Sequence, residues 1–300
     1  MAAVWRFEAI GTPWSVETPH PLSDDTRAEV TALIDGFDRE WSRFRPDSVV
    51  SRLAAHPGKA PLPDDAEPML RAYSVLSDAT AGAVNPLIGN SLEKLGYGAG
   101  YRLTAQRPEA APADWRRVLS WSGALVVNEP VTIDVGALGK GRLVDRVLAL
   151  VQQHIADTDA DAADASATVV VDASGDMAVR GAPMRIGLEH PYDATRAIGV
   201  ITLQDAALCA SAANRRAWGD GLHHVLDART GLPVDTVAAT WAVAPDAMSA
   251  DAIATALFFD GGTTIAHEWG VEWVRMLTNG RVEFSPGSEA ELFSRAASVG

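Results

Sequence analysis

Strand-like and helix-like patterns follow one another along the chain without a regular period, and this irregular order constrains the fold most. A doubly wound sheet requires strands and helices that alternate regularly, whereas mixed runs are typical of α+β folds. Alternating side chains predict a first strand at 5–10, and apolar residues spaced by three and four predict an amphipathic helix from Ser23 to Phe44. Further strands are predicted at 14–17, 124–127, 131–134, 168–172, 184–188, 198–203, 225–226, 237–243, 273–277 and 281–284, and further helices at 67–80, 141–153 and 249–259. The sequence therefore predicts an α+β protein.

The composition indicates a globular protein rather than a disordered, membrane-spanning or nucleic-acid-binding one. Apolar residues make up 47% of the chain and charged residues 21%, which suits a sizeable core. No stretch approaches the ~18–20 uncharged apolar residues of a membrane helix, and the first residues lack the pattern of a secretory signal. Acidic residues outnumber basic ones by 39 to 25, and a net charge of −14 repels a nucleic-acid backbone. We expect a soluble, cytoplasmic protein with no nucleic-acid partner and no membrane insertion.

Two local features narrow the kinds of site that the chain can hold. The single cysteine, Cys209, excludes an internal disulfide and every multi-cysteine zinc or iron–sulfur site. Residues 156–167 form an acidic run of small residues, which predicts a solvated loop. In so acidic a protein, a phosphate ligand must be held locally by a metal, by backbone amides or by a few placed cations.

Residues 133–145 contain the most suggestive motif, a predicted strand that ends at Asp134, a glycine-rich turn and the start of a helix. Glycines let the backbone approach phosphate oxygens, and a helix N-terminus presents free N–H groups. Lys140 lies between two glycines of this turn. The spacing fits neither a Walker A loop nor a GxGxxG fingerprint, so an ordinary strand-to-helix turn stays an alternative. The glycine-rich segment 81–101 is a second place where backbone can approach a ligand.

Asp251 and Thr255 lie four residues apart in the predicted helix 249–259 and therefore share one of its faces. A carboxylate and a hydroxyl are hard oxygen donors, which suit Mg²⁺ held jointly by protein and diphosphate. An aspartate near a helix N-terminus is also a common capping residue, and this simpler interpretation stays open.

His223 and His224 are adjacent, so on an extended segment their side chains point to opposite faces. They are therefore not expected to bind the same metal ion. We expect one buried structural histidine and one that faces a cleft. The small-residue turn that ends at Asp176 follows an apolar strand, and it is either a plain β-turn or a place where amides and a carboxylate meet a ligand.

Taken in order, seven short motifs resemble the FAD:protein FMN transferase (ApbE-like) family. The resemblance spans roughly residues 5 to 280. The motifs are Ala9–Thr12, Phe44–Ser48 with Ser51 and Arg52, Gly82–Pro86, Ile133–Gly141 with Asp145, Ala173–Asp176, His224–Gly231 and Ala250–Ala256.

The resemblance implies a single domain over residues 1–300 with a two-lobed, T-fold-like α+β architecture, in which mixed sheets carry flanking helices and a ligand cleft lies between the lobes. FAD would lie in this cleft as the substrate, with Mg²⁺ on its diphosphate. The implied metal ligands are the backbone carbonyl of Ala137, the carboxylate of Asp251 and the hydroxyl of Thr255. The residues implied to bind FAD are Ile10, Phe44, Ala83, Val84, Asn85, Asp134, Lys140, Gly175, Asp176 and His224.

The implied reaction is a post-translational flavinylation: FMN passes from FAD to a threonine or serine hydroxyl of an acceptor flavoprotein, and AMP is released. Mg²⁺ and Lys140 would stabilise the charge on the phosphate oxygens in the transition state. His224 is the candidate general base, with Asp176 and Asp134 as alternatives. Two other functions fit the same residues, namely an Mg²⁺-dependent FAD diphosphatase that yields FMN and AMP, and a non-catalytic protein that binds or stores FAD.

The chain departs from the usual family pattern at several positions. The family usually has Met at Ile10, Tyr at Phe44 and Asp at Asn85. It also usually has Gly at Ser174, Pro at Ala228 and Ser-Gly at Ser211-Ala212. Ile10 and Phe44 keep apolar walls, so we expect FAD binding to survive. Asn85 removes a charge, which bears on recognition of the adenine side.

Overall fold

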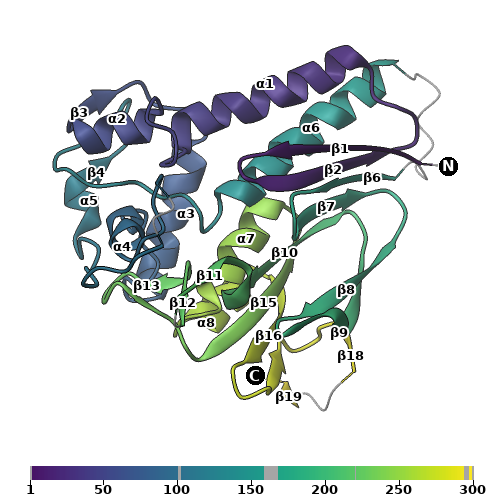
Figure 1. Ribbon diagram of the computed structural model, residues 1–300. Helices are drawn as coiled ribbons and strands as arrows, with labels where there is room; N and C mark the ends of the chain where they lie inside the picture. Colours follow the sequence, from purple (N-terminus) through teal and green to yellow (C-terminus); the bar gives the residue numbers. More distant parts are fainter. Residues whose placement is uncertain (1, 101–102, 159–167, 220, 294–296, 299–300) are drawn as a thin grey trace.

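A nine-stranded sheet organises the larger lobe, in the order β1-β2-β6-β7-β10-β15-β16-β17-β19. Neighbours pair antiparallel except for β17 and β19, which are parallel. The strands are β1 Ala3–Ala9, β2 Thr12–Thr18, β6 Val169–Asp172, β7 Asp176–Arg180, β10 Ala206–Ala212, β15 Val237–Ala244, β16 Glu272–Leu277, β17 Val282–Phe284 and β19 Ala297–Ser298. The computed structural model describes the chain except residues 1, 101–102, 159–167, 220, 294–296 and 299–300 (Figure 1).

Three long helices cover one face of this sheet. Helix α6 (Gly139–Thr158) contacts β6 and β7, α7 (Ala247–Ala256) contacts β10 and β15, and α1 (Asp24–Trp41) packs on α6. The main apolar core lies between these helices and the sheet. The other face carries a second sheet, β18 (Glu291–Leu292), β9 (Asp193–Leu203) and β8 (Met184–His190), over its own apolar cluster.

A smaller lobe gathers beside the end of α1 (Figure 1). It contains α2 (Val49–Ala55), α3 (Ala66–Ala79), α4 (Gly89–Lys94), α5 (Trp115–Val118) and a sheet of β3 (Gly58–Ala60), β5 (Leu125–Val127) and β4 (Leu119–Ser120). The remaining elements are η1 (Ala213–Arg216), the pair β11 (Ala217–Trp218) and β12 (Leu222–His223), the pair β13 (Leu226–Asp227) and β14 (Leu232–Pro233), and α8 (Gly262–Glu268). Mixed sheets with flanking helices confirm the predicted α+β fold.

Helix α1 shows how the sequence specifies these elements. The Ser23 hydroxyl accepts a hydrogen bond from the Thr26 N–H and caps the helix where the sequence predicts its start. A stripe of residues at helical spacing turns into the core, namely Val30, Ile34, Phe37 and Trp41. The helix ends at Trp41, three residues before the predicted end, and the extended backbone at Ser42 lets Phe44 turn toward the other lobe.

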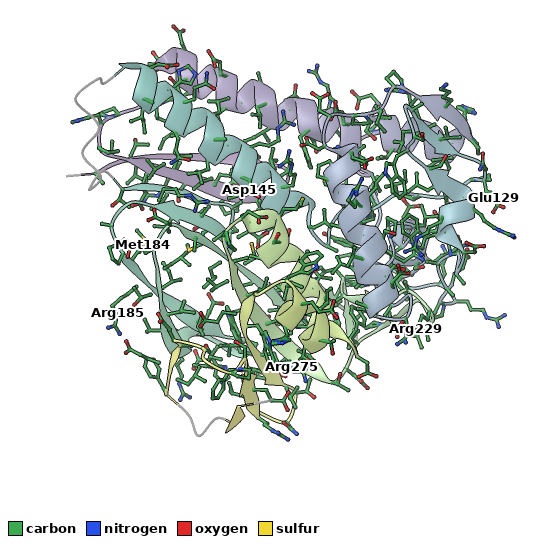
Figure 2. The ribbon with its side chains drawn as sticks, turned by 180° about the vertical axis from the view of Figure 1, so that it is seen from behind. Glu129, Asp145, Met184, Arg185, Arg229 and Arg275 are labelled. Carbon is green, nitrogen blue, oxygen red and sulfur yellow. The ribbon has the colours of Figure 1, made fainter. Side chains whose placement is uncertain are left out.

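Helices α6 and α7 are fixed to each other by a capping interaction (Figure 2). The carboxylate of Asp145 on α6 accepts hydrogen bonds from the N–H groups of Ala247 (2.7 Å) and Met248 (2.9 Å) in the first turn of α7. Burial raises the pKa of Asp145 to about 6, and these two hydrogen bonds limit the rise. The arrangement orients α7, which carries Asp251 and Thr255.

Some predicted elements differ from the structure. Residues 131–134 belong to no strand, because the Thr132 N–H donates to the Asn90 side chain and the Asp134 N–H donates to the Pro86 carbonyl instead of to a sheet. Residues 156–158 of the predicted acidic loop continue α6, and 159–167 lie outside the described residues. The predictions missed several short elements and three strands of the main sheet, namely α2, α4, α5, α8, η1, β3, β4, β7, β10, β11, β12, β14, β18 and β19. None of the helices described is both long enough and apolar enough to span a bilayer.

Candidate active site

A cleft of about 850 Å³ lies between the two lobes. Side chains from α1, α3, α6, α7 and the main sheet line it, together with loops around residues 83–88, 134–137 and 224–226. The cleft brings together twelve of the thirteen residues that the family resemblance implies. These are Phe44, Ala83, Val84, Asn85, Asp134, Ala137, Lys140, Gly175, Asp176, His224, Asp251 and Thr255.

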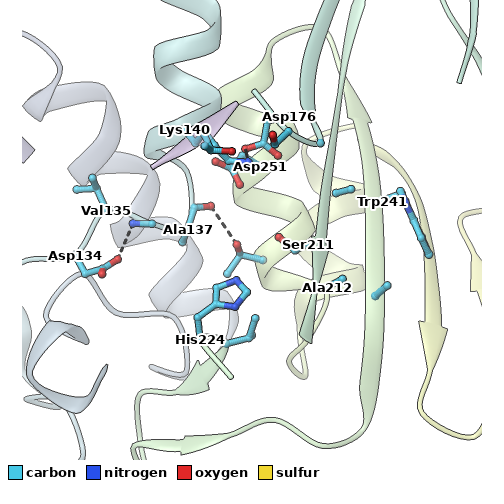
Figure 3. Close-up of a pocket in the computed structure, with 18 of the residues that line it drawn as sticks. Asp134, Val135, Ala137, Lys140, Asp176, Ser211, Ala212, His224, Trp241 and Asp251 are labelled. Atoms are coloured by element: carbon cyan, nitrogen blue, oxygen red, sulfur yellow. Dashed lines mark hydrogen bonds and ion pairs between the residues drawn. The ribbon is translucent and has the colours of Figure 1, made fainter. Parts of the chain in front are cut away.

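Three oxygen donors meet where the turn before α6 faces α7 (Figure 3). The Thr255 hydroxyl lies 3.3 Å from the Ala137 carbonyl oxygen, although the two residues are 118 positions apart. Asp251, one turn earlier on α7, is buried, and its Oδ2 accepts a hydrogen bond of 2.9 Å from the Gly141 N–H. Adjacent oxygens around Mg²⁺ are about 3 Å apart in an octahedron with ligand distances of about 2.1 Å. A carbonyl, a hydroxyl and a carboxylate in this arrangement therefore fit a small divalent cation.

This oxygen set differs from the usual cluster of acidic and histidine ligands. Among the residues that the structure describes, no three His, Cys, Asp or Glu side chains form a group that would hold a metal ion. A cation here would therefore depend on further oxygens from a bound ligand, as is usual for Mg²⁺ on a phosphate.

Lys140 supplies the positive charge next to these donors. Its Nζ lies 2.9 Å from Oδ2 of the fully buried Asp176, and it donates a hydrogen bond of 3.0 Å to the Ala173 carbonyl. Burial alone would lower the pKa of Lys140, but the carboxylates of Asp176 and Asp251 outweigh burial and raise it. Lys140 is thus a fixed cation beside the Asp176 and Asp251 carboxylates, placed to meet a negatively charged ligand.

The Asp134 side chain is held from two sides at the rim of the cleft. Its Oδ2 accepts from Nε of Arg43 at 2.5 Å, and its Oδ1 accepts from the Gly136 N–H at 2.7 Å. Nη1 of Arg43 donates to the Tyr97 carbonyl at 2.7 Å. The predicted ligand residue Asp134 therefore also has a structural role, since it shapes the turn that leads to Ala137.

Aromatic rings form one wall of the cleft. Phe44 and Tyr97 meet edge to face with centroids 5.6 Å apart, and Tyr97 stacks on Trp218 at 5.3 Å. The Arg43 guanidinium lies 4.2 Å from the Phe44 centroid. Such a wall can accept a flat heterocycle such as adenine or isoalloxazine.

Ile10 and Asn85, two of the predicted FAD-binding residues, pack within the protein. Ile10 does not line the cleft, because it lies in the β1–β2 turn and packs against the main core, while Gly11, Thr12 and Pro13 do line it. Asn85 is buried; its side chain donates to the Pro112 carbonyl and accepts from the Leu87 N–H. An aspartate could not make the first of these bonds, so the asparagine suits this backbone.

The two histidines, His223 and His224, lie in different surroundings, as the sequence predicts. His223 is buried; its Nε2 lies 2.8 Å from the Val234 carbonyl and its Nδ1 accepts from the Val225 N–H, and burial lowers its pKa. His224 lines the cleft, and its imidazole points into it (Figure 3). A neutral structural histidine thus stands next to one that is placed for chemistry.

Several residues of the cleft carried no usable signal in the sequence. Tyr73 belongs to the apolar stripe of helix α3, a pattern that predicts an ordinary core residue. Arg43 follows a helix end with no motif of its own, and Trp241 lies within an apolar strand. Only the assembled cleft distinguishes these residues from ordinary packing.

The comparison of sequences places the chain among flavin transferases. The family model of the ApbE family matches residues 10–272. A relative from Treponema pallidum (strain Nichols), named FAD:protein FMN transferase, is 26% identical over 287 residues, which is 86% of this chain and 79% of that protein. A relative of the same name from Vibrio cholerae serotype O1 is 24% identical over 263 residues, 80% of this chain and 74% of its own length.

Solved structures share the fold. An ApbE protein from Thermotoga maritima superposes with a TM-score of 0.80 at 23% identity, covering 95% of this chain and 97% of that one. The apo form of the flavinyl transferase ApbE from Pseudomonas stutzeri superposes with a TM-score of 0.74 at 22% identity, covering 94% of this chain and 93% of that one. At these identities the likeness establishes the architecture, and the chemistry must be argued from the residues of the cleft.

Proposed function

The chain belongs to the ApbE family, and we propose that it transfers FMN from FAD to a threonine or serine hydroxyl of an acceptor flavoprotein, releases AMP and requires Mg²⁺. As a family member it is assigned as an FAD:protein FMN transferase, the name that its relatives carry. The Mg²⁺ requirement, the hydroxyl target and the leaving group are the parts that we propose.

The convergence of Ala137, Asp251 and Thr255 carries this proposal. A pure FAD-binding protein has no need of a hard-cation site, whereas transfer at a diphosphate does. A magnesium ion bound there would neutralise charge on the diphosphate and on the leaving AMP. The 3.3 Å between the Thr255 hydroxyl and the Ala137 carbonyl, with Asp251 one turn away, supports this assignment.

Residues of this chain would orient the two substrates. The aromatic wall at Phe44 would hold a ring of FAD, and the small, largely buried residues Ala83 and Val84 line the same cleft. Gly175, with a φ of 103°, closes a turn that brings backbone next to Lys140 and Asp176. Lys140 would lie near the phosphates and stabilise the negative charge that develops there.

The reaction exchanges a phosphoanhydride bond of FAD for a phosphoester bond to the acceptor. The acceptor hydroxyl oxygen attacks the phosphorus on the FMN side of FAD, and the bond from that phosphorus to the bridging oxygen of AMP breaks. His224 would accept the hydroxyl proton, because its imidazole faces the cleft; Asp176 and Asp134 are already engaged with Lys140 and Arg43. AMP leaves with the bridging oxygen.

One incubation separates this function from its alternatives. The protein is mixed with FAD, Mg²⁺ and a threonine-containing acceptor fragment, and the products are separated under denaturing conditions. Transfer predicts flavin fluorescence on the acceptor and an equal amount of AMP. Free FMN with AMP would instead identify an FAD diphosphatase, and intact FAD would identify a binding or storage protein.

A matched pair of variants ties the activity to the proposed metal site. Asp251→Asn keeps an oxygen for the Gly141 N–H but removes the charge, and we expect at least a hundredfold loss of Mg²⁺-dependent AMP release. Asp246→Asn changes the N-cap of the same helix outside the cleft, and it should retain nearly full activity because asparagine also caps helices well. Equal activity of the wild type and Asp251→Asn would refute the metal assignment.

A further inference from the structure

The turn from Asp134 to Ala137 is held by side chains as well as by its own backbone. The segment before it belongs to no strand, so no ladder of sheet hydrogen bonds fixes its position. The Asp134 N–H donates to the Pro86 carbonyl, and the Asp134 side chain is held by Arg43 and by the Gly136 N–H. These contacts fix the start of the turn, and the N–H groups of Leu138 and Gly139 close its end on the Val135 carbonyl, so the Ala137 N–H is bound by a group outside the turn.

That group is the hydroxyl of Tyr73, which reaches the turn from helix α3. Tyr73 is fully buried and lies 61 residues before Asp134 in the sequence. Its hydroxyl donates a hydrogen bond of 3.0 Å to the Asp134 carbonyl and accepts one of 3.2 Å from the Ala137 N–H. Burial and the nearby Asp134 carboxylate hold the pKa of Tyr73 well above its usual range, so the phenol keeps the proton that it donates.

These contacts fix the direction of the Ala137 carbonyl. The peptide before Ala137 is held because its N–H donates to Tyr73. The peptide after it is held because the Leu138 N–H donates to the Val135 carbonyl at 3.2 Å. In a planar trans peptide the Ala137 carbonyl points opposite to the Leu138 N–H, so the bond to Val135 sets its direction, while the bond to Tyr73 holds the Ala137 backbone in place; the oxygen then faces Thr255.

We propose that Tyr73 is a positioning residue whose hydroxyl holds in place the turn that presents the Ala137 carbonyl as a ligand for the divalent cation. The inference rests on the proposed function, because it presupposes a cation at Ala137, Asp251 and Thr255. Tyr73 touches neither the cation nor FAD in this account. It acts through the backbone that it ties together.

The test measures metal affinity directly, with Mn²⁺ as the probe. Mn²⁺ is titrated into the protein with saturating FAD, and the free ion is followed by electron paramagnetic resonance. Tyr73→Phe keeps the ring and the packing and removes only the hydroxyl. We expect the dissociation constant for Mn²⁺ to rise by about 10-fold to 100-fold, the usual effect of removing a partner that orients a metal ligand. Turnover should return toward the wild-type value at high Mg²⁺, since only the metal affinity is weakened.

Ser77→Ala is the matched control for a purely structural effect. Ser77 lies one turn further along α3, is buried, and its hydroxyl accepts a hydrogen bond of 3.1 Å from Nε1 of Trp115, away from the cleft. This variant should lose stability without any change in Mn²⁺ affinity. Gly136→Ala probes the same turn from its other side, because the added Cβ would lie 2.7 Å from Oδ1 of Asp134, and it should weaken Mn²⁺ binding as Tyr73→Phe does.

The outcomes separate the two claims. A wild-type protein that binds no Mn²⁺ with FAD present would overturn the proposed function itself. If the wild type binds Mn²⁺ and Tyr73→Phe binds it equally well, the proposed function stands and the positioning role is refuted. Equal losses of affinity in Tyr73→Phe and Ser77→Ala would also refute it, because the effect would then follow stability alone.

Discussion

Gly141 lies where α6 and α7 are in close contact, and replacing it by alanine tests whether that contact builds the site. The Gly141 N–H donates to Oδ2 of Asp251. A Cβ at this position would lie 2.1 Å from the Ala247 carbonyl oxygen and 2.8 Å from the Asp251 Cβ. The first contact is with backbone, which cannot swing away as the end of a side chain can.

The size of the perturbation follows from these distances. Even a tight contact of 3.0 Å requires the helices to separate by about 0.9 Å, the difference from 2.1 Å. Overpacking of this kind typically costs about 1–3 kcal/mol of folding free energy. A displacement of about 1 Å at reacting groups can reduce the rate by roughly 10²-fold. We therefore expect Gly141→Ala to melt several degrees lower and to lose most of its turnover.

The assay compares thermal unfolding with Mg²⁺-dependent AMP release, and it uses Gly36→Ala as the control. Gly36 lies inside α1, and a Cβ there would meet nothing within 4 Å. Alanine at this position should stabilise the helix by about 0.5–1 kcal/mol and leave turnover unchanged. If Gly141→Ala melts and turns over like the wild type, the close approach of α6 and α7 does not build the site, and the reasoning is wrong.

Three further predictions concern charge and ring packing. Lys140→Ala leaves the buried Asp176 without its cation, so we expect the free energy of unfolding in urea to fall by about 3–5 kcal/mol and AMP release to become at least tenfold slower. Wild-type stability and wild-type AMP release in this variant would contradict the prediction. The raised pKa of Asp145, about 6, contributes about 3 kcal/mol to the free energy of unfolding below pH ~3.8, and this contribution is lost as the pH rises through 6. Asp145→Asn should remove that part of the pH dependence of stability. An unchanged slope of stability against pH in the variant would exclude this role of Asp145. Phe44→Ala should increase the KM for FAD, and the factor of this increase should be about tenfold larger than the factor by which kcat decreases. Phe44→Tyr keeps the ring and should have the wild-type KM. Equal KM values in the two variants would show that the ring does not hold FAD.

Sequence patterns predicted the elements whose signals are local. The cap at Ser23 and the apolar stripe behind it define α1, and the spacing of Asp251 and Thr255 is enough to place both on one face of α7. Strands rich in β-branched residues, such as 168–172, were also predicted, whereas β10 was missed because its alanines and serines carry little strand preference.

The parts that the sequence could not predict depend on contacts between distant residues. Residues 131–134 have a strand-like composition, but their hydrogen bonds go to Asn90 and Pro86, and composition does not choose a partner. Tyr73 fits the apolar stripe of α3 as well as any core residue does, and only the contact of its hydroxyl with Ala137 distinguishes it. Ile10 was assigned to the cleft from a motif, but the turn directs its side chain to the core.

The resemblance to a family supplied the set of site residues, and the fold explains why they meet. Ala137 and Thr255 come together because Asp145 on α6 caps α7 and Gly141 lets the two helices approach closely. Neither cause is visible in the motifs themselves. The geometry of the oxygen donors is therefore a property of the packed helices.

The central claim is that one divalent cation joins Ala137, Asp251 and Thr255 to the diphosphate of FAD. The most direct measurement is anomalous diffraction from crystals grown with FAD and Mn²⁺. The account predicts a single manganese peak within about 2.0–2.4 Å of the Ala137 carbonyl, an Asp251 carboxylate oxygen and the Thr255 hydroxyl, with diphosphate oxygens completing the shell. A diphosphate bound in the cleft with no manganese at these three oxygens would contradict it.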